Sequence, residues 1–414
     1  MVCQLFVGYR RERSVRKANR RRNDLRPKVL YKRSRGAFQA KSTPTVEKKP
    51  LHLPAPQDLN TRLPMGIERK KQDLLEYDRK MLVQWLADRS LASYRADQIL
   101  KWIYIRGEND FHRMTDLSKA IRAMLADHFV VGRLPLDREM VSEDGSRKYR
   151  LRLSDGAMIE AVLMPERNHS TLCVSSQVGC AMGCRFCMTG AGGLVRNLTR
   201  GEIVSQVREM ISKTDAGLPL TNLVFMGMGE PLANFDSLVS ALSTLTDNDY
   251  GLKFSGQRIT VSTAGLVPQM AALGQQTRVN LAVSLNATDN DTRSRLMPIN
   301  RKYPIEALLA ACRDYPLPKG RRITFEYILI AGVNDSLTEA RKLAKLLRPI
   351  RAKINLIPFN PHPGSEFLRS GEAAVLAFQK ILIDSHYTAI IRRSKGQDIA
   401  AACGQLAAEG RSGA

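Results

Sequence analysis

Strand-like and helix-like segments alternate from residue 171 onward, and this alternation restricts the fold more than any other feature. The segments between the candidate strands are amphipathic, and the first opens with the capping-box pattern Thr199-x-x-Glu202. The pattern Ser336-x-x-Glu339 and Pro304 mark two later helix starts. Strands separated by crossover helices form parallel sheets, so the pattern predicts an α/β fold, a barrel or partial barrel. The six candidate strands are 171–174, 222–226, 258–262, 279–285, 323–328 and 353–358.

The chain before this alternation divides into parts of different composition. Helical periodicity that places Trp85 and Trp102 on apolar faces predicts a small helical domain, with Thr115-Asp116 as the cap of its third helix. Turns at Asp144-Gly145 and Asp155-Gly156 predict strands around them. We expect both tryptophans to be core residues rather than base-stacking platforms. The expected parts are a basic disordered extension (1–64), a helical accessory domain (65–135), a β-rich connector (136–165), the barrel (166–397) and a C-terminal segment (398–414).

The charge balance points to a polyanionic partner. There are 64 Lys and Arg residues against 40 Asp and Glu, a net charge of +24. Residues 1–50 hold 16 basic and 3 acidic residues, which leaves +11 for the remaining 364. Nucleic acid is the simplest partner, and an anionic membrane surface or no polyanion at all are the alternatives. No apolar run approaches the roughly 18 residues of a spanning helix, which argues against an integral membrane protein.

Three of the seven cysteines are crowded directly after the first candidate strand. The number is odd and the chain is large, which is typical of an intracellular metal or redox site rather than a disulfide framework. Cys180-x3-Cys184-x2-Cys187 can hold three corners of a cubane iron–sulfur cluster and leave the fourth iron open. Zinc is the weaker alternative, because a fourth ligand is missing and His169 lies across a candidate strand.

Polar and glycine residues follow the other candidate strands, where parallel α/β folds carry their chemistry. In Met226–Leu232, glycines allow close approach of a ligand, and Glu230 offers a carboxylate to an ammonium group. Taken singly, each of these residues is more often a loop or cap residue. The candidate cofactor-binding residues are Gly229, Glu230, Ser262, Ser284, Leu285, Asn286 and Asn360.

The cysteine spacing after the first strand resembles that of radical S-adenosylmethionine (SAM) enzymes. The stretches Leu172–Cys180, Gly-Met-Gly-Glu-Pro-Leu, Asn355–Pro361 and Gly396–Leu406 together resemble the RlmN family of dual-specificity RNA methyltransferases. The resemblance runs from about residue 70 to 408. It implies a radical SAM partial (β/α)6 barrel with a small N-terminal helical domain and a short β extension. It also implies one 4Fe–4S cluster on Cys180, Cys184 and Cys187, and two SAM molecules per turnover. Asn286 departs from the family, in which many relatives have histidine.

The resemblance implies methylation of adenine C2 in 23S rRNA and in an anticodon-adjacent position of tRNA. By this analogy Cys403 accepts a methyl group, Cys173 resolves an enzyme–RNA adduct as a Cys173–Cys403 disulfide, and Glu160 accepts the C2 proton. This requires the C-terminal segment to fold back over the cluster face. The implied partners are both RNAs, a flavodoxin- or ferredoxin-like one-electron reductant and a thiol reductant, with a monomeric, cytoplasmic enzyme and no membrane.

Two rival functions remain. The related Cfr enzymes methylate C8 of the same rRNA adenine. From another class, a non-catalytic iron–sulfur or zinc module that binds RNA would need neither Cys403 nor the Gly-Met-Gly-Glu stretch.

Overall fold

The computed structural model describes residues 71–214 and 217–407. The predicted basic extension of residues 1–64 and the end of the predicted C-terminal segment, 408–414, lie outside the described residues. Within the described part, no helix combines the length and the apolar character needed to cross a membrane.

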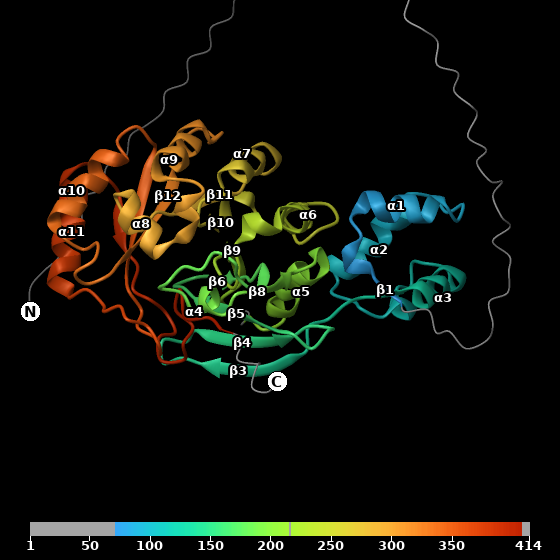
Figure 1. The fold of residues 1–414 in the computed structure, drawn as a ribbon. Helices are drawn as coiled ribbons and strands as arrows, with labels where there is room; N and C mark the ends of the chain where they lie inside the picture. The colour runs from blue at the N-terminus through green and yellow to red at the C-terminus, as the bar shows by residue number, and fades with distance from the viewer. Residues whose placement is uncertain (1–70, 215–216, 408–414) are drawn as a thin grey trace, which may run out of the picture. The chain divides into compact units, whose positions relative to one another are not determined.

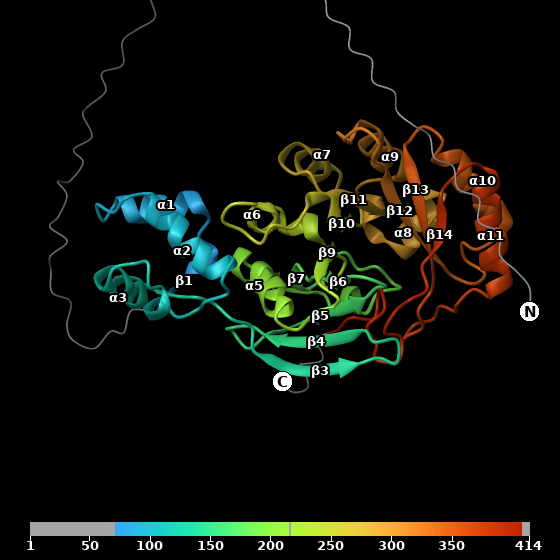
Figure 2. The ribbon, with the colours of Figure 1, turned by 180° about the vertical axis from the view of Figure 1, so that it is seen from behind.

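One ten-stranded sheet organises the molecule, in the order β14-β13-β12-β11-β10-β9-β6-β5-β4-β3 (Figure 1 and, for β13 and β14, Figure 2). Its central strands are the six that the sequence predicts, with ends within two residues of the predicted ones, and neighbours among them pair in parallel. The sheet ends at β14 and β3 without closing, which confirms the partial barrel. The six strands are β6 (Ser170–Cys173), β9 (Leu220–Phe225), β10 (Ile259–Thr263), β11 (Asn280–Ser284), β12 (Ile323–Leu329) and β13 (Ala352–Pro358).

Both ends of this sheet extend beyond the predicted barrel. The short strand β14 (Ala389–Ile391) pairs in parallel with β13, as Figure 2 shows, and was not predicted. At the other end β3 (Leu136–Val141), β4 (Arg147–Arg152) and β5 (Met158–Pro165) run antiparallel, and β5 pairs with β6. The predicted connector is therefore part of the same sheet as the barrel.

Helices follow the central strands, and the predicted helix starts are largely confirmed. Thr199 and Glu202 form a complete capping box at α5. Ser336 caps α10, but the carboxylate of Glu339 bonds to neighbouring side chains instead of completing the box. Pro304 is the residue before α9 rather than inside its first turn. The helices are α5 (Arg200–Ile211), α6 (Phe235–Thr246), α7 (Val267–Gln276), α8 (Asn290–Leu296), α9 (Ile305–Asp314), α10 (Leu337–Leu346) and α11 (Glu372–Asp384).

The helical domain comprises α1 (Arg79–Ala87), α2 (Tyr94–Tyr104) and α3 (Lys119–His128). The predicted cap of the third helix is wrong, because Ser118 caps α3 while Asp116 accepts a hydrogen bond from the Trp102 indole at 2.5 Å. Trp85 and Trp102 both pack against the core but remain half-buried, and an arginine covers the ring of each.

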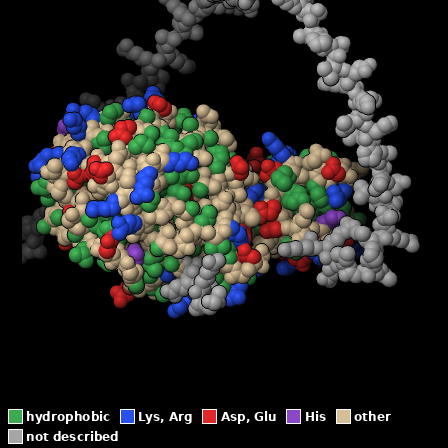
Figure 3. Space-filling view, viewed as in Figure 1, with side chains coloured by type: hydrophobic (Ala, Val, Ile, Leu, Met, Phe, Trp, Pro, Cys, Tyr) green, Lys and Arg blue, Asp and Glu red, His purple; other side chains and the backbone are tan. Residues whose placement is uncertain are grey.

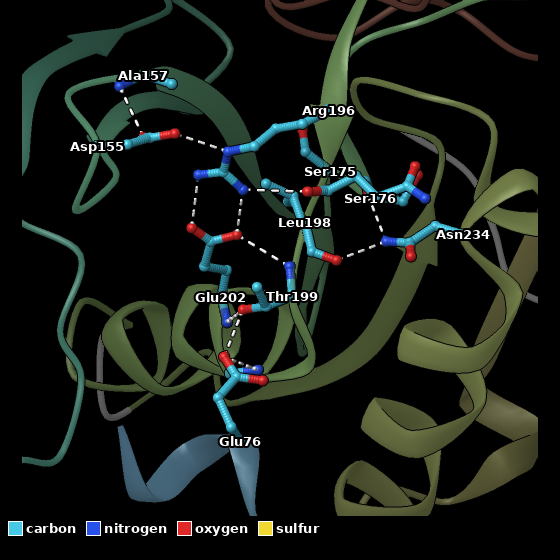
Figure 4. Close-up of polar contacts among 12 residues, drawn as sticks. Glu76, Asp155, Ala157, Ser175, Ser176, Arg196, Leu198, Thr199, Glu202 and Asn234 are labelled. Atoms are coloured by element: carbon cyan, nitrogen blue, oxygen red, sulfur yellow. Dashed lines mark hydrogen bonds and ion pairs between the residues drawn. The ribbon is translucent and has the colours of Figure 1, made fainter. Parts of the chain in front are cut away.

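A polar network joins this domain to the start of α5 (Figure 4). The Glu76 carboxylate accepts hydrogen bonds from the Gly201 amide, at 3.1 Å, and from the Thr199 hydroxyl. Arg196 bonds to Glu202 in the same helix turn at 2.8 Å. A carboxylate at a helix N-terminus is favoured because the exposed amides carry partial positive charge. Glu76 therefore fixes the helical domain to the first barrel helix.

Candidate active site

The cysteine motif lies in a loop that a small hairpin closes at its base. Strands β7 (Gln177–Gly179) and β8 (Leu194–Asn197) pair antiparallel, and between them lie the three cysteines and α4 (Met188–Ala191). The motif thus follows β7 rather than the first barrel strand directly. Gly179 has a φ of +78°, and a Cβ there would meet the Gly193 carbonyl oxygen at 2.0 Å. Only glycine fits this neck, which sets where the cysteine loop begins.

The three thiols of this loop influence one another without converging on one point. Cys180 is buried, while Cys184 and Cys187 are half-buried, and none of the described cysteines forms a disulfide. Burial raises the pKa of Cys180 to about 11, with smaller contributions from Glu230 and Cys187. Burial, Cys187 and Cys180 raise the pKa of Cys184. In the described residues, no three His, Cys, Asp or Glu side chains are grouped to hold a metal ion.

Three free thiols in one loop, with no fourth His, Cys, Asp or Glu grouped with them among the described residues, suit an iron–sulfur cluster with one open iron better than a four-ligand zinc site. A raised thiol pKa disfavours the thiolate in the metal-free protein. Metal binding supplies the positive charge that stabilises the thiolates and releases their protons. The loop is therefore compatible with a 4Fe–4S cluster.

Glu230 joins the ends of the second and third barrel strands beside this loop. It is buried, and its carboxylate accepts hydrogen bonds from the amides of Leu232, at 3.0 Å, and Ala264, at 2.7 Å. Burial raises its pKa to about 7, against these two hydrogen bonds. The Gly229 backbone has a φ of +99°, and a Cβ there would lie 2.5 Å from the Gln177 side chain. Gly229 is thus required by its packing against the β7–β8 hairpin, whether or not a ligand also approaches its backbone.

A carboxylate that sequence reasoning missed lies inside the barrel. Glu326 on β12 accepts a hydrogen bond from the Ser262 hydroxyl at 3.0 Å. Burial raises the pKa of Glu326, and its charge in turn contributes to the raised pKa values of Cys403 and Cys173. A lone glutamate in the apolar stretch Ile323–Leu329 is the signal that could have identified it.

A buried arginine, also missed, fastens the ends of the third and fourth barrel strands. The Arg293 guanidinium donates to the carbonyl oxygens of Ala264 (2.8 Å), Leu285 (3.0 Å) and Ser284 (3.1 Å). Its side chain is fully buried, and burial lowers its pKa to about 10, an effect that Cys184 opposes. The clamp therefore sets the backbone of two predicted cofactor-binding residues.

Asn286 has its side-chain hydrogen-bonding groups engaged within the protein. Its carbonyl oxygen accepts from the Ile328 amide at 2.8 Å, and its amide nitrogen lies 3.2 Å from the Met297 sulfur. The backbone φ of +58° is a left-handed conformation that asparagine tolerates better than most residues. Asn286 thus shapes the turn that follows the fourth strand.

The C-terminal segment folds over the cysteine loop, as the predicted pairing of two distant cysteines requires. The Gly404 carbonyl accepts a hydrogen bond from the Met188 amide at 2.8 Å, and the Leu406 carbonyl accepts one from the Thr189 hydroxyl. A Cβ on Gly404 would lie 3.0 Å from the Phe186 carbonyl oxygen. Asn360, after the sixth strand, donates to the Cys403 carbonyl at 3.2 Å.

A buried ion pair between Lys148 and Glu160 also holds the C-terminal segment in place. The Glu160 carboxylate pairs with Lys148 at 3.2 Å and accepts a hydrogen bond from the Ala407 amide at 3.0 Å. Lys148 also donates to the Ala400 carbonyl at 3.2 Å. Burial raises the pKa of Glu160, and the Lys148 charge opposes that rise. The pair therefore binds both ends of the segment that carries Cys403.

Cys403 and Cys173 lie within electrostatic reach of each other. Burial raises the pKa of Cys173, and Cys403 adds to that effect. Cys403 is solvent-exposed, yet loss of hydration raises its pKa to about 12, with contributions from Glu326 and Cys187. The structure thus brings Cys173, Cys403 and the cysteine loop together at the carboxyl ends of the parallel strands.

The comparisons with known proteins agree with this geometry. Residues 72–131 match the model of the ribosomal RNA large subunit methyltransferase N-terminal domain, and residues 174–344 match the radical SAM superfamily. A dual-specificity RNA methyltransferase RlmN from Desulfosudis oleivorans is 56% identical over 82% of this chain and 91% of its own length. One from Geobacter sulfurreducens is 52% identical over 78% of this chain and 89% of its own. The chain belongs to the RlmN family.

A solved structure supports the family at the level of the fold. The crystal structure of a radical SAM methyltransferase from Sphaerobacter thermophilus has a TM-score of 0.77 and 46% identity, and covers 82% of this chain and all of that one. This member of the RlmN family is accordingly a radical SAM methyltransferase that uses a 4Fe–4S cluster and SAM.

One relative corrects the predicted extent of the resemblance. The RlmN 2 of Myxococcus xanthus is 48% identical over 90% of this chain. Residues 65–414 make up only about 85% of the 414 residues, so this match includes part of the basic extension. The similarity therefore begins earlier than residue 70.

Proposed function

We propose that this enzyme methylates C2 of an adenine in the peptidyl transferase centre of 23S rRNA, and of the adenine beside the anticodon in tRNA, through S-methylated Cys403. The observation that carries the proposal is the position of the C-terminal segment. It bonds to the cysteine loop through Gly404 and Leu406, and it presents an accessible thiol beside buried Cys173. A non-catalytic RNA-binding module has no need of this arrangement.

Cys180, Cys184 and Cys187 hold the cluster in this proposal. When bound, the cluster and SAM supply an electron, a methyl group and a hydrogen-abstracting carbon radical. The buried Glu230 carboxylate faces the end of the third strand, and Ser262, Asn286 and Asn360 lie at neighbouring strand ends. The proposed SAM-binding residues are Gly229, Glu230, Ser262, Ser284, Leu285, Asn286 and Asn360.

The two remaining cysteines divide the transfer between them. Adenine C2 is electron-poor and does not attack a methyl sulfonium, so the methyl carbon must reach it as a radical carried on the Cys403 sulfur. The carbon–carbon bond then links enzyme and RNA. Glu160 takes the C2 proton, and the adduct also gives up its unpaired electron, which the oxidised cluster would accept. The Cys173 thiolate then attacks the Cys403 sulfur and the bond from that sulfur to the methylene carbon breaks. The released carbon takes up a proton and becomes the methyl group of the RNA, and a Cys173–Cys403 disulfide remains. An external thiol reduces this disulfide before the next turnover.

The Lys148–Glu160 pair determines how Glu160 can serve as a base. Lys148 opposes the rise in the Glu160 pKa that burial causes, and it so favours the ionised carboxylate, which is the form that accepts a proton. Glu160→Gln keeps the size and the hydrogen-bonding oxygen but cannot accept that proton. We expect it to accumulate the enzyme–RNA adduct, and free turnover in this variant would remove Glu160 from the reaction.

The cysteine variants test the division of roles. Cys403→Ala has no methyl carrier and should form no adduct. Cys173→Ala should form the adduct and fail to release it, which appears as a slow-migrating band that nuclease trims. Normal turnover in Cys173→Ala, or an adduct in Cys403→Ala, would show that the two-cysteine scheme is wrong.

Mass spectrometry of adenosine from RNA treated with enzyme, SAM and reductant identifies the product. The proposal expects 2-methyladenosine in both RNAs. A product of 8-methyladenosine would assign the Cfr-like reaction, and the absence of both products would refute RNA methylation.

We further propose that the enzyme is a cytoplasmic monomer with a flavodoxin- or ferredoxin-like electron donor.

A further inference from the structure

A basic hollow lies at the end of the sheet opposite the cysteine loop. It has a volume of about 1020 Å³ and is formed by the segments that precede β12, β13 and β14 together with the ends of α10 and α11. Figure 3 shows Lys and Arg side chains along the upper left margin of the molecule, over α10. Six cations line the hollow: Arg321, Arg322, Arg341, Lys345, Arg348 and Arg351.

The positive charge of the hollow is not neutralised within the described residues. None of its six cations forms an ion pair there, and the hydrogen bonds of Arg321, Arg322 and Arg351 go to uncharged groups. Among the described lining residues Asp384 is the one carboxylate, and it pairs with Lys380 at 2.9 Å. Like charges held together without counterions repel each other, so such a cluster favours an external polyanion.

A neighbouring lysine registers the same uncompensated charge. Lys353 on β13 has its pKa lowered chiefly by burial and further by Arg392 and Arg322. The effect of Arg322 on a residue inside the sheet agrees with a positive potential that no nearby acid cancels.

The position of the hollow narrows the choice of polyanion. Arg322 precedes β12 and Arg351 precedes β13, whereas the cysteine loop lies by the carboxyl ends of the strands. The seven residues of β13 span about 23 Å at 3.3 Å per residue. An acidic electron-donor protein docked here would be far from the cluster, and electron transfer declines steeply with distance. A structured RNA is long enough to place a base beside the exposed Cys403 and its backbone in the hollow.

We propose that this hollow binds the phosphate backbone of the substrate RNA at a distance from the target adenine. This inference rests on the proposed function. Six cations without an acidic partner among the described residues match the repeating negative charge of an RNA strand, and this charge is the same for every base sequence. The contact would raise affinity for large folded RNAs in a salt-dependent manner.

The test compares two double variants that each remove two positive charges. Lys345→Gln/Arg348→Gln removes unpaired cations of the hollow. The control, Arg313→Gln/Lys342→Gln, removes two exposed cations that lie outside the hollow and pair with Asp314 and Glu339. Lys342 lies on α10, the helix that also carries Lys345. Affinity for full-length tRNA and for a 23S rRNA fragment is measured by fluorescence anisotropy across roughly 50–200 mM salt.

We expect the hollow variant to lower the slope of log affinity against log salt by about 1.4–1.8, the value for two lost phosphate contacts. The control variant should match the wild type. Equal slopes in the hollow variant and the wild type would overturn the inference. If the slope is unchanged and a flavodoxin also reduces the hollow variant more slowly than the wild type, the hollow binds an acidic protein instead of RNA. Binding is read without turnover, so a wild type that forms no methyladenosine disproves the proposed function separately.

Discussion

The two ends of the same parallel sheet use charge in opposite ways. At the carboxyl end, buried charges have their hydrogen-bonding partners inside the protein: Arg293 on three carbonyls, Glu230 on two amides, and Glu160 on Lys148. At the amino end, the six cations of the hollow have no acidic partner among the described residues. Hydrogen bonds within the protein hold the buried charged groups in place for chemistry, whereas surface cations without acidic partners remain available to an external anion. Substitutions at the two ends should therefore fail in different ways.

The largest difference concerns the cluster. Cys184→Ala removes one of three proposed ligands, so we expect loss of cluster assembly and with it loss of SAM cleavage. Lys345→Gln/Arg348→Gln at the other end should keep full iron and full cleavage. Iron analysis and product quantification check both, with Cys312→Ala as the cysteine control. Full iron content in Cys184→Ala would reject the ligand assignment.

The next largest effect separates a buried from an exposed arginine. Arg293→Met removes the donor of four hydrogen bonds, three to carbonyl oxygens and one to the Asn300 side chain. We expect it to lower the free energy of unfolding by roughly 3–5 kcal/mol. Arg295→Met, exposed on the same helix, and Arg348→Met should each stay within about 0.5 kcal/mol of wild type. Urea denaturation of the metal-free protein measures all three, and equal losses would contradict the comparison.

A smaller effect should appear as pH dependence at the carboxyl end. Glu230 has a folded-state pKa of about 7, raised by burial from 4.5. The folded protein therefore binds this proton more tightly than the unfolded chain, and stability falls as pH rises from about 4.5 to about 7. The loss is at most roughly 3 kcal/mol at 1.36 kcal/mol per pKa unit. Glu230→Gln should flatten the pH profile of unfolding, and an unchanged profile would show that another group causes it.

The smallest expected effect concerns the attachment of the helical domain. Glu76→Gln keeps one hydrogen-bonding oxygen for Gly201 but removes the charge at the start of α5. We expect a loss of about 0.5–1 kcal/mol, measured by thermal unfolding. Glu108→Gln, which removes an exposed pair with Arg113 in the same domain, is the control and should change little.

Sequence patterns predicted the parts of this molecule that repeat or that have fixed spacing. The six parallel strands follow from apolar runs between amphipathic helices, and the cysteine loop follows from its x3-x2 spacing. The strand β14 has three residues, too few for a recognisable pattern. Ser118 and Thr115-Asp116 are all competent caps, and only the tertiary bond from Trp102 to Asp116 decides between them.

The residues that the sequence concealed are single charges whose burial depends on distant segments. Arg293 lies in a polar helix and looks like a surface residue, because the three carbonyls that it binds come from other parts of the fold. Lys148 similarly gains its role from Glu160 and Ala400. Sequence periodicity predicts which positions along a helix or strand are buried, but it does not predict which distant residue will pair with a buried charge.

The docking of the last residues onto the cysteine loop has a consequence for biosynthesis. A ribosome finishes the loop at Cys187 about 200 residues before it reaches Cys403. At about 5–20 residues per second, the three thiols exist for roughly 10–40 s before their cover has been made. Chain growth itself therefore leaves an interval in which the cysteine loop has been made and the segment that covers it has not. A circularly permuted chain that began with the cover would lose that interval.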